Sequence, residues 1–225
     1  MSFADKKLSE IAISIPGSTA LLREYDLDFC CGGADTLGAA VAEKNLNLAE
    51  IEARLTELQN SKKQDDEQRW LTAPYADIIE HIIHRYHERH KQQLSELFVL
   101  AERVESVHGD RDDCPIGVAA EIQNIYADLN SHMMKEEQIL FPMIKMGNYA
   151  MARMPIQVME HEHAEHGEHL DVLKALTNNL TPPADACNTW RALYSGIQEF
   201  MDDLMMHIHT ENNILFPRVI EEGSR

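Results

Sequence analysis

Two stretches of the chain, residues 128–142 and 203–217, repeat a pattern of side chains that can bind metal ions. They are identical at 8 of 15 positions, with a constant offset of 75 residues. The shared polar positions are an aspartate, a histidine four residues later and a glutamate four residues after that: Asp128, His132 and Glu136, then Asp203, His207 and Glu211. Residues four apart lie along one face of an α-helix. Two such faces turned toward each other would bring imidazole nitrogens and carboxylate oxygens to one point.

A second repeat lies upstream of each copy. His87 and His90 are three residues apart, and His163 and His166 repeat this pair at an offset of 76 residues. The repeating unit is therefore a helical hairpin, and two copies predict four helices. Both histidines of a pair flank the same helical stripe, so periodicity does not decide which of them binds metal.

The resulting set of ligands predicts two metal ions. Each half supplies one histidine from its first helix, then one histidine and one glutamate from its second, which gives four histidines and two glutamates. This set is larger than one ion needs and suits two ions bridged by the carboxylates. Nitrogen and oxygen ligands without thiolate fit iron and also allow manganese or zinc. Packing alone gives no reason to repeat polar ligands on faces turned toward the core.

Other polar residues near these stripes have weaker patterns. Asp128 and Asp203 precede His132 and His207 by one turn, so we expect them either to orient these imidazoles or to lie on a solvated helix face. Glu137 lies one residue off the stripe and is expected to be dispensable for metal binding. The histidines without a matching partner, or near a helix end, are expected to be solvated or supporting: His81, His84, His108, His161, His169 and His209.

Apolar periodicity, prolines and glycines indicate the elements that must position the ligands. We expect a small helical domain over residues 1–60, with one helix at 48–58, a polar linker over 61–70 and a bundle over 71–225. The bundle helices are predicted at about 72–108, 115–146, 155–178 and 183–221. Their short loops imply antiparallel neighbours and an up-down-up-down bundle. Pro142 and Pro217 must kink or end their helices.

Composition narrows the class of protein. The formal net charge is −18, with 38 acidic and 20 basic residues, which argues against a nucleic-acid partner. No apolar run approaches the roughly 20 residues of a membrane span, and the first residues lack a secretory segment, so we expect a cytoplasmic protein. All 12 histidines follow residue 80, which places any metal chemistry in the last two thirds of the chain.

Four cysteines in a chain of this length do not indicate a disulfide framework. Cys30 and Cys31 precede two glycines, near the expected start of a helix, where a lowered thiol pKa would make them reactive. The alternative is a pair of small residues in a tight turn, and Asp26 and Asp28 would raise the thiol pKa. Cys114 and Cys187 show no pattern that assigns them a role.

The pattern of His87, His132-x-x-x-Glu136, His163 and His207-x-x-x-Glu211 resembles the hemerythrin-like di-iron four-helix bundles. With the segments at 25–33, which contains Cys30 and Cys31, and at 131–137, the chain resembles the RIC (repair of iron centres) proteins over nearly its whole length. The resemblance implies an all-α fold. It also implies that the first histidine of each pair, His87 or His163, is the ligand. Two iron ions would then be bridged by Glu136, Glu211 and an oxo or hydroxo group, with room for a small ligand such as NO.

The same resemblance implies a stress-response function, the repair of iron–sulfur clusters damaged by nitric oxide or peroxide, by supplying iron or removing NO. The alternatives are an enzyme that reduces nitric oxide at a di-ferrous centre and a module that binds or senses O₂ or NO. The enzyme would need an electron-donor protein, because the sequence shows no flavin or nicotinamide motif. The sequence leaves open the client protein, the redox partner and the oligomeric state, a homodimer included.

Overall fold

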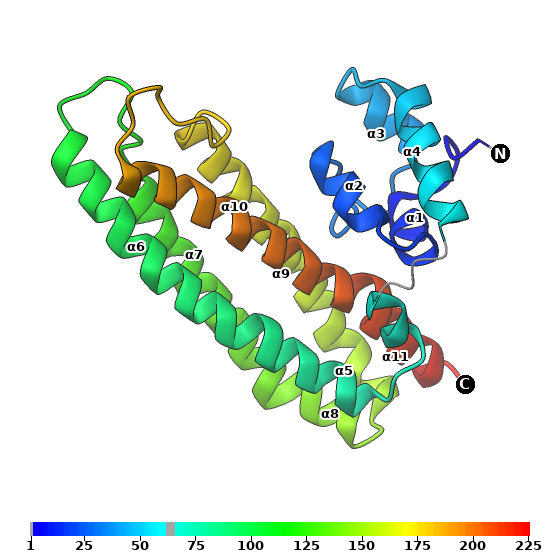
Figure 1. Ribbon diagram of the computed structural model, residues 1–225. Helices are drawn as coiled ribbons and strands as arrows, with labels where there is room; N and C mark the ends of the chain where they lie inside the picture. Colours follow the sequence, from blue (N-terminus) through cyan, green and yellow to red (C-terminus); the bar gives the residue numbers. More distant parts are fainter. Residues whose placement is uncertain (1, 62–65) are drawn as a thin grey trace.

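The protein was analysed as a computed structural model, which describes residues 2–61 and 66–225 (Figure 1). Within these ranges the regular structure is helical, apart from one isolated bridge between Lys7 and Thr36. The predicted all-α class is therefore confirmed. Residues 62–65 of the predicted linker lie outside the described residues, and Asp66–Leu71 forms a 3₁₀-helix. No helix in the described ranges combines the length and the apolar character that crossing a membrane requires.

The N-terminal region folds as a cluster of short helices around an apolar core. Its helices are α1 (Leu8–Ser14), α2 (Ser18–Glu24), α3 (Leu37–Glu43) and α4 (Leu48–Asn60). Thr36 and Asn47 cap α3 and α4 by accepting hydrogen bonds from the backbone N–H groups of Ala39 and Glu50. Ile11, Leu22 and Phe29 are fully buried between these helices. The predicted helix at 48–58 is confirmed.

Four long helical segments form the bundle within residues 66–225. The first combines α5 (Tyr75–His81), a π-helical turn (Ile82–His87) and α6 (Glu88–His108); the second combines α7 (Val118–Lys135), a π-helical turn (Glu136–Leu140) and α8 (Phe141–Lys145); the third is α9 (Tyr149–Leu176); the fourth combines α10 (Asn188–His209), a π-helical turn (Thr210–Leu215) and α11 (Phe216–Gly223). Consecutive segments run antiparallel and lie side by side, so the predicted up-down-up-down bundle is confirmed (Figure 1).

The third helix begins earlier than predicted. It starts at Tyr149, and Pro155, the expected first residue, lies inside it. Proline weakens a helix interior because it lacks an N–H group and crowds the preceding turn. Here Ala152, Ile156 and Met159 continue one buried face through the proline. Tertiary packing of this face outweighs the local preference.

Prolines in the second and fourth segments distort the helix without ending it. Each π-helical turn ends two residues before its proline, Leu140 before Pro142 and Leu215 before Pro217, and α8 and α11 continue beyond. A widened turn accommodates a proline that cannot donate a helical hydrogen bond. Such turns are frequent at functional sites. In the described part of this chain they contain three of the predicted ligands, His87, Glu136 and Glu211.

The N-terminal helices lie beside the fourth segment, near α10 and α11 (Figure 1). The turn between α2 and α3 makes the polar contacts: Asn213 donates to the Phe29 carbonyl at 2.8 Å, and Lys174 pairs with Asp26 at 2.7 Å. Arg23 lies 3.5 Å from Asp202 of α10. These contacts place the turn that carries the cysteine pair directly on the bundle.

Candidate metal centre

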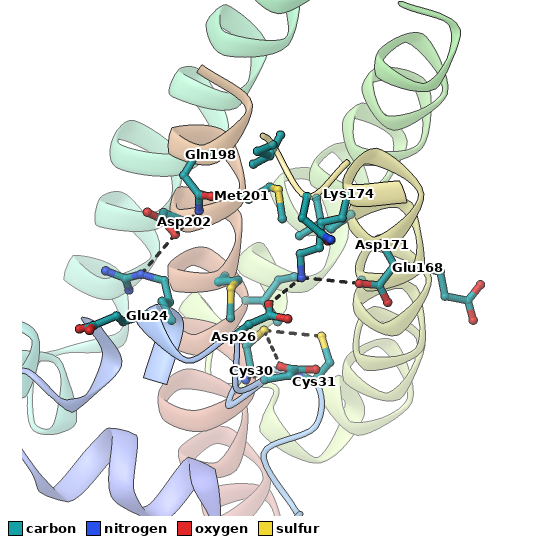
Figure 2. Close-up of a pocket in the computed structure, with 18 of the residues that line it drawn as sticks. Glu24, Asp26, Cys30, Cys31, Glu168, Asp171, Lys174, Gln198, Met201 and Asp202 are labelled. Carbon is teal, nitrogen blue, oxygen red and sulfur yellow. Dashed lines mark hydrogen bonds and ion pairs between the residues drawn. The ribbon is translucent and has the colours of Figure 1, made fainter. Parts of the chain in front are cut away.

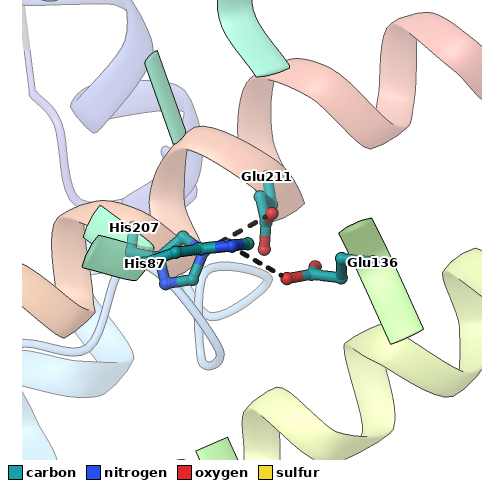
Figure 3. A group of neighbouring side chains, drawn as sticks. All are labelled: His87, Glu136, His207 and Glu211. Atoms are coloured by element: carbon teal, nitrogen blue, oxygen red, sulfur yellow. Dashed lines mark hydrogen bonds and ion pairs between the residues drawn. The ribbon is translucent and has the colours of Figure 1, made fainter. Parts of the chain in front are cut away.

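The six predicted ligands converge in the middle of the bundle, at or beside its π-helical turns. Figure 3 shows four of them, His87, Glu136, His207 and Glu211. Among the described residues they form two groups of four: His87, Glu136, His207 and Glu211, and His132, Glu136, His163 and Glu211. In each group the ligand atoms lie within 4.8 Å of one another, and all six side chains are at most 1% exposed. Both glutamates belong to both groups. The arrangement therefore suits two ions that share two carboxylates.

Each glutamate turns one oxygen toward each group. Glu136 Oε2 lies 3.3 Å from His87 Nε2, and its Oε1 lies 3.4 Å from His132 Nε2. Glu211 repeats this arrangement with Oε1 at 3.5 Å from His207 Nε2 and Oε2 at 3.1 Å from His163 Nε2. This is the geometry of a carboxylate that bridges two ions through separate oxygens.

The imidazole nitrogens within each group are also spaced for a shared ion. His87 Nε2 and His207 Nε2 are 3.2 Å apart, and His132 Nε2 and His163 Nε2 are 3.1 Å apart. Two nitrogens bound at about 2.1 Å to one ion, with an angle near 90°, are separated by roughly 3.0 Å. Each pair of nitrogens therefore fits two neighbouring positions around one metal ion.

The carboxylates of Glu136 and Glu211 face the imidazoles of the cluster at 3.1 to 3.5 Å. In the described part of the chain, neither oxygen of Glu136 or of Glu211 has a hydrogen-bond partner, although both side chains are fully buried. Leaving a buried carboxylate unpaired is costly, and a cation removes this cost. The types of donor atom and their burial therefore both fit metal ions.

Burial and neighbouring charges shift the pKa values of two cluster residues, His132 and Glu211. Burial would lower the pKa of His132, but the carboxylates of Glu136 and Glu211 outweigh it and raise this pKa to about 9. Burial, together with the charge of Glu136, raises the pKa of Glu211 to about 7. Without a cation the cluster therefore retains protons on these side chains at neutral pH. A metal ion that binds must displace them.

Three polar residues hold the Nδ1 atoms of ligand histidines. His87 Nδ1 donates to Glu137 at 2.9 Å, His132 Nδ1 donates to Glu162 at 2.9 Å, and His163 Nδ1 donates to Asn212 Oδ1 at 2.8 Å. A hydrogen bond at Nδ1 leaves Nε2 free for metal and orients the ring. Glu137 therefore orients a candidate ligand, whereas the sequence pattern predicts that it is dispensable for metal binding.

Asp128 and Asp203 do not take the orienting role that we considered for them. Asp128 is exposed and pairs with His169 at 3.2 Å. Asp203 accepts hydrogen bonds from Arg85 and from Gln93. His207 Nδ1 has no hydrogen-bond partner in the described residues. The aspartates lie one turn away from the histidines, but their side chains pair with residues of neighbouring helices.

The internal repeat contains a pattern from which the orienting roles of Glu137 and Asn212 could have been predicted. Glu137 and Asn212 occupy equivalent positions, 75 residues apart, and each holds the histidine from the first helix of its own hairpin. Glu162 and Tyr86 are equivalent at an offset of 76, but Tyr86 stacks on His207 at 5.4 Å instead of accepting from it. The two halves of the site therefore differ at this position.

The second histidine of each pair is buried beside the cluster without belonging to either group. His90 lies against His207, with ring centroids 5.3 Å apart, and His166 lies against His132 at 4.9 Å. Burial lowers the pKa of His166 to about 2 and that of His90 well below its ordinary value, so both are neutral. The structure thus favours the first histidine of each pair, in agreement with the family resemblance.

The pair Asn212 and Asn213 allows a matched test of ring orientation. Asn212→Ala removes the acceptor at His163 Nδ1, and we expect metal affinity to fall roughly 10- to 100-fold. Asn213 contacts Phe29 and His209 but not His163, so Asn213→Ala should keep the parent affinity. Metal retention against a chelator series measures both. Equal losses in the two variants would show that domain contact, and not imidazole orientation, controls affinity.

His81 lies outside the cluster, and its lowered pKa predicts that the stability of the protein depends on pH. Burial, with the charges of Arg69 and Arg85, lowers its pKa from 6.5 to about 4. The unfolded chain therefore binds this proton first as pH falls from 6.5 to 4, and the free energy of unfolding decreases over that window. In His81→Gln the urea midpoint should fall less between pH 7 and pH 5 than in the parent.

The exposed neighbour His84 supplies the control for this experiment. It is exposed at the surface, where its pairs with Glu80 and Glu88 contribute little to stability, so His84→Gln should follow the parent at both pH values. The His81 interpretation is wrong if His81→Gln loses as much stability as the parent between the two pH values.

The cysteine pair lies beside the cluster, but not at a helix start. The helix begins at Leu37, six residues after Cys31. The hydrogen bond with Cys31, burial and the charge of Asp28 together raise the pKa of Cys30 well above its ordinary value. Of the two alternatives that the sequence left open, the raised thiol pKa holds for Cys30. Cys31 Sγ lies 3.3 Å from the backbone carbonyl of His163, so this turn reaches the edge of the site.

Comparison with known proteins covers both regions of the chain. Residues 78–219 match the family model of the hemerythrin HHE cation binding domain, and residues 4–59 match ScdA_N, a domain of unknown function. A protein of Haemophilus influenzae named "Probable iron-sulfur cluster repair protein" is 67% identical over 222 residues, covering 99% of this chain and all of that protein. The iron-sulfur cluster repair protein YtfE of Musicola paradisiaca is 56% identical, and that of Escherichia coli O81 is 53% identical. Both alignments cover 98% of this chain and at least 98% of the relative.

Proposed function

This chain belongs to the family of iron-sulfur cluster repair proteins, and on that premise we propose that it restores iron–sulfur clusters damaged by nitric oxide or by oxidants. The observation that carries the proposal is similarity over the whole chain, which includes the cysteine-bearing domain as well as the bundle. A carrier of oxygen alone has no need of the first domain. A cytoplasmic location, predicted from the sequence, is part of this proposal.

We infer that the resident metals are two iron ions with an oxo or hydroxo bridge, held by His87, His132, Glu136, His163, His207 and Glu211. Histidine and carboxylate ligands without thiolate suit iron. When bound, iron supplies redox chemistry and a coordination position for a small ligand such as NO or O₂. The donor set of the buried cluster supports this assignment.

The side chains around the cluster hold and shield it. Glu137, Glu162 and Asn212 fix three imidazole rings through Nδ1. Phe141 stacks on His87 and Phe216 stacks on His163, with centroids 5.9 and 6.1 Å apart. These rings exclude water from one side of each metal position. A dry, oriented ligand shell favours slow, controlled exchange of iron over free exchange with solvent.

The repair proposal is tested on a dehydratase whose iron–sulfur cluster has been inactivated by NO. The iron-loaded chain should restore its activity faster than the same concentration of free ferrous iron, under anaerobic conditions. His132→Ala, which removes one candidate ligand, should perform no better than free iron. If the loaded parent chain gave no advantage over free iron, the repair function would lose its support.

The shared carboxylates also favour a second candidate, reduction of nitric oxide. Glu136 and Glu211 would hold two neighbouring ions, and the ions would supply coordination positions for two NO molecules. The reaction converts two NO, two electrons and two protons into nitrous oxide and water, and a donor protein must supply further electrons after the first turnover. Anaerobic addition of NO to the di-ferrous chain, followed by gas analysis, tests it. Absence of nitrous oxide would eliminate this candidate.

A further inference from the structure

The turn between α2 and α3 brings two thiols and a carboxylate together at the wall of a cavity (Figure 2). Asp28, Cys30 and Cys31 place one ligand atom each within 4.8 Å of the others. From this geometry we propose that Asp28, Cys30 and Cys31 form a second cation site, for a divalent ion of intermediate softness such as Fe²⁺ or Zn²⁺. This site is separate from the four-histidine, two-glutamate cluster and differs from it in containing sulfur.

The sulfur spacing matches a shared ion. Cys30 Sγ and Cys31 Sγ are 3.8 Å apart. Two thiolates bound tetrahedrally at about 2.3 Å to one ion are also separated by about 3.8 Å. Cys30 Sγ lies 3.2 Å from Asp28 Oδ1, close to the spacing of neighbouring sulfur and oxygen ligands. Little movement of the side chains is needed for all three to reach one ion.

The three donors are held in place before any ion binds. Asp28 Oδ1 accepts hydrogen bonds from the backbone N–H groups of Cys30 and Cys31, both at 2.9 Å, and Oδ2 accepts from Gly32 at 2.8 Å. Asn212 fixes the Cys30 carbonyl at 3.0 Å. Oδ2 keeps one lone pair, so these contacts orient Asp28 and leave it capacity as a ligand. Preorganisation of this kind favours binding.

The simpler interpretation is that the two thiols only form hydrogen bonds with each other and with Asp28 in a tight turn. The surroundings argue against it, because the site is not enclosed in the core. Asp28, Cys30 and Cys31 line an open cavity of about 780 Å³ between the N-terminal helices and the bundle. A cation therefore has access to the partly exposed Cys31, and the buried Cys30 beside it also borders the cavity.

The charge of the cavity also favours a cation. Among the described residues that line it, six are acidic and three are basic. Two of the bases, Lys44 and Lys174, pair with Asp26, and Arg23 pairs with Asp202. Among the described residues, Asp28 has no ion pair with a base. A cavity with excess negative charge raises the local concentration of cations. Binding of a divalent ion would release the two thiol protons to water and form two metal–sulfur bonds.

The position of the site indicates a use that rests on the proposed repair function. Cys31 Sγ contacts the backbone carbonyl of His163, a candidate iron ligand. An ion at the cysteine turn would thus lie next to His163, which belongs to the buried cluster, and would be open to the cavity. Such a site suits iron on its way into or out of the protein.

Cobalt(II) tests the site independently of repair. Thiolate bound to Co²⁺ gives an intense near-ultraviolet charge-transfer band, and the histidine and glutamate cluster has no sulfur to produce one. We expect this band when the full-length, reduced chain is titrated with Co²⁺ without oxygen. Cys30→Ser and Cys31→Ser should each lose most of it, and Asp28→Asn should weaken Co²⁺ binding at this site by roughly tenfold.

The remaining cysteines and the other cluster provide the controls. Cys114→Ser and Cys187→Ser should keep the band, and His132→Ala should keep it as well, so failure of the repair proposal would not affect this result. Absence of the band in the parent chain would overturn the proposal, whatever the variants do. Persistence of the band in the double variant Cys30→Ser, Cys31→Ser would overturn it too.

Discussion

Replacing Glu136 with glutamine should reduce bound metal from about two ions per chain to nearly none, a larger loss than removal of any one histidine. Glu136 turns one oxygen to each of the two metal positions, at 3.3 Å from His87 and 3.4 Å from His132. The amide keeps the shape of the side chain but loses the negative charge and one oxygen. Elemental analysis of protein purified without oxygen measures the effect.

Two other glutamates calibrate this result. Glu165 is exposed on α9, two residues from His163, and within the described residues it pairs with His161 alone, so Glu165→Gln should keep both ions. Glu137 holds His87 through Nδ1 and should give an intermediate result, a roughly tenfold weaker affinity in Glu137→Gln. The bridging assignment would be contradicted if Glu136→Gln retained one tightly bound ion with the other lost, because a ligand of one ion alone gives that outcome.

Removing the metal from the parent chain should lower the thermal midpoint of the bundle strongly. The buried cluster then holds two carboxylates whose oxygens lack hydrogen-bond partners among the described residues. A ligand present at a thousand times its dissociation constant stabilises the native state by about 4 kcal/mol. For a chain of this size, that is a shift of roughly 8 to 16 °C. Calorimetry with and without a chelator measures the shift.

The double variant Glu136→Gln, Glu211→Gln is the control for this experiment. It should show almost no response to the chelator, because it no longer binds metal in the bundle. Its midpoint should equal or exceed that of the metal-free parent, since two buried charges have been removed. Equal shifts in parent and variant would mean that the stabilising metal lies elsewhere, and the turn with Cys30 and Cys31 would be the first place to look.

Helix periodicity left open which histidine of each His-x-x-His pair binds metal, and the family resemblance selected His87 and His163. The sequence by itself determined the helical class, the four-helix bundle and the other four converging side chains, His132, Glu136, His207 and Glu211. These follow from local rules: residues four apart share a helix face, and a repeat of that spacing in two hairpins makes the two faces equivalent. Even the residues that hold His87 and His163 are present in the repeat, as Glu137 and Asn212. The pattern does not predict toward which neighbouring helix the side chain of a residue beside the stripe will point.

Tertiary structure decided the parts of the site that depend on how separate elements meet. Asp128 and Asp203 share the stripe of His132 and His207, yet they pair with side chains of neighbouring helices, and Glu162 reaches His132 from α9. Cys31 lies beside His163 although 132 residues separate them. Helix periodicity acts over one or two turns, whereas the rotation of each helix and the docking of the first domain depend on the packing of the whole apolar core. For that reason only the folded structure places the cysteine turn at the edge of the candidate metal centre.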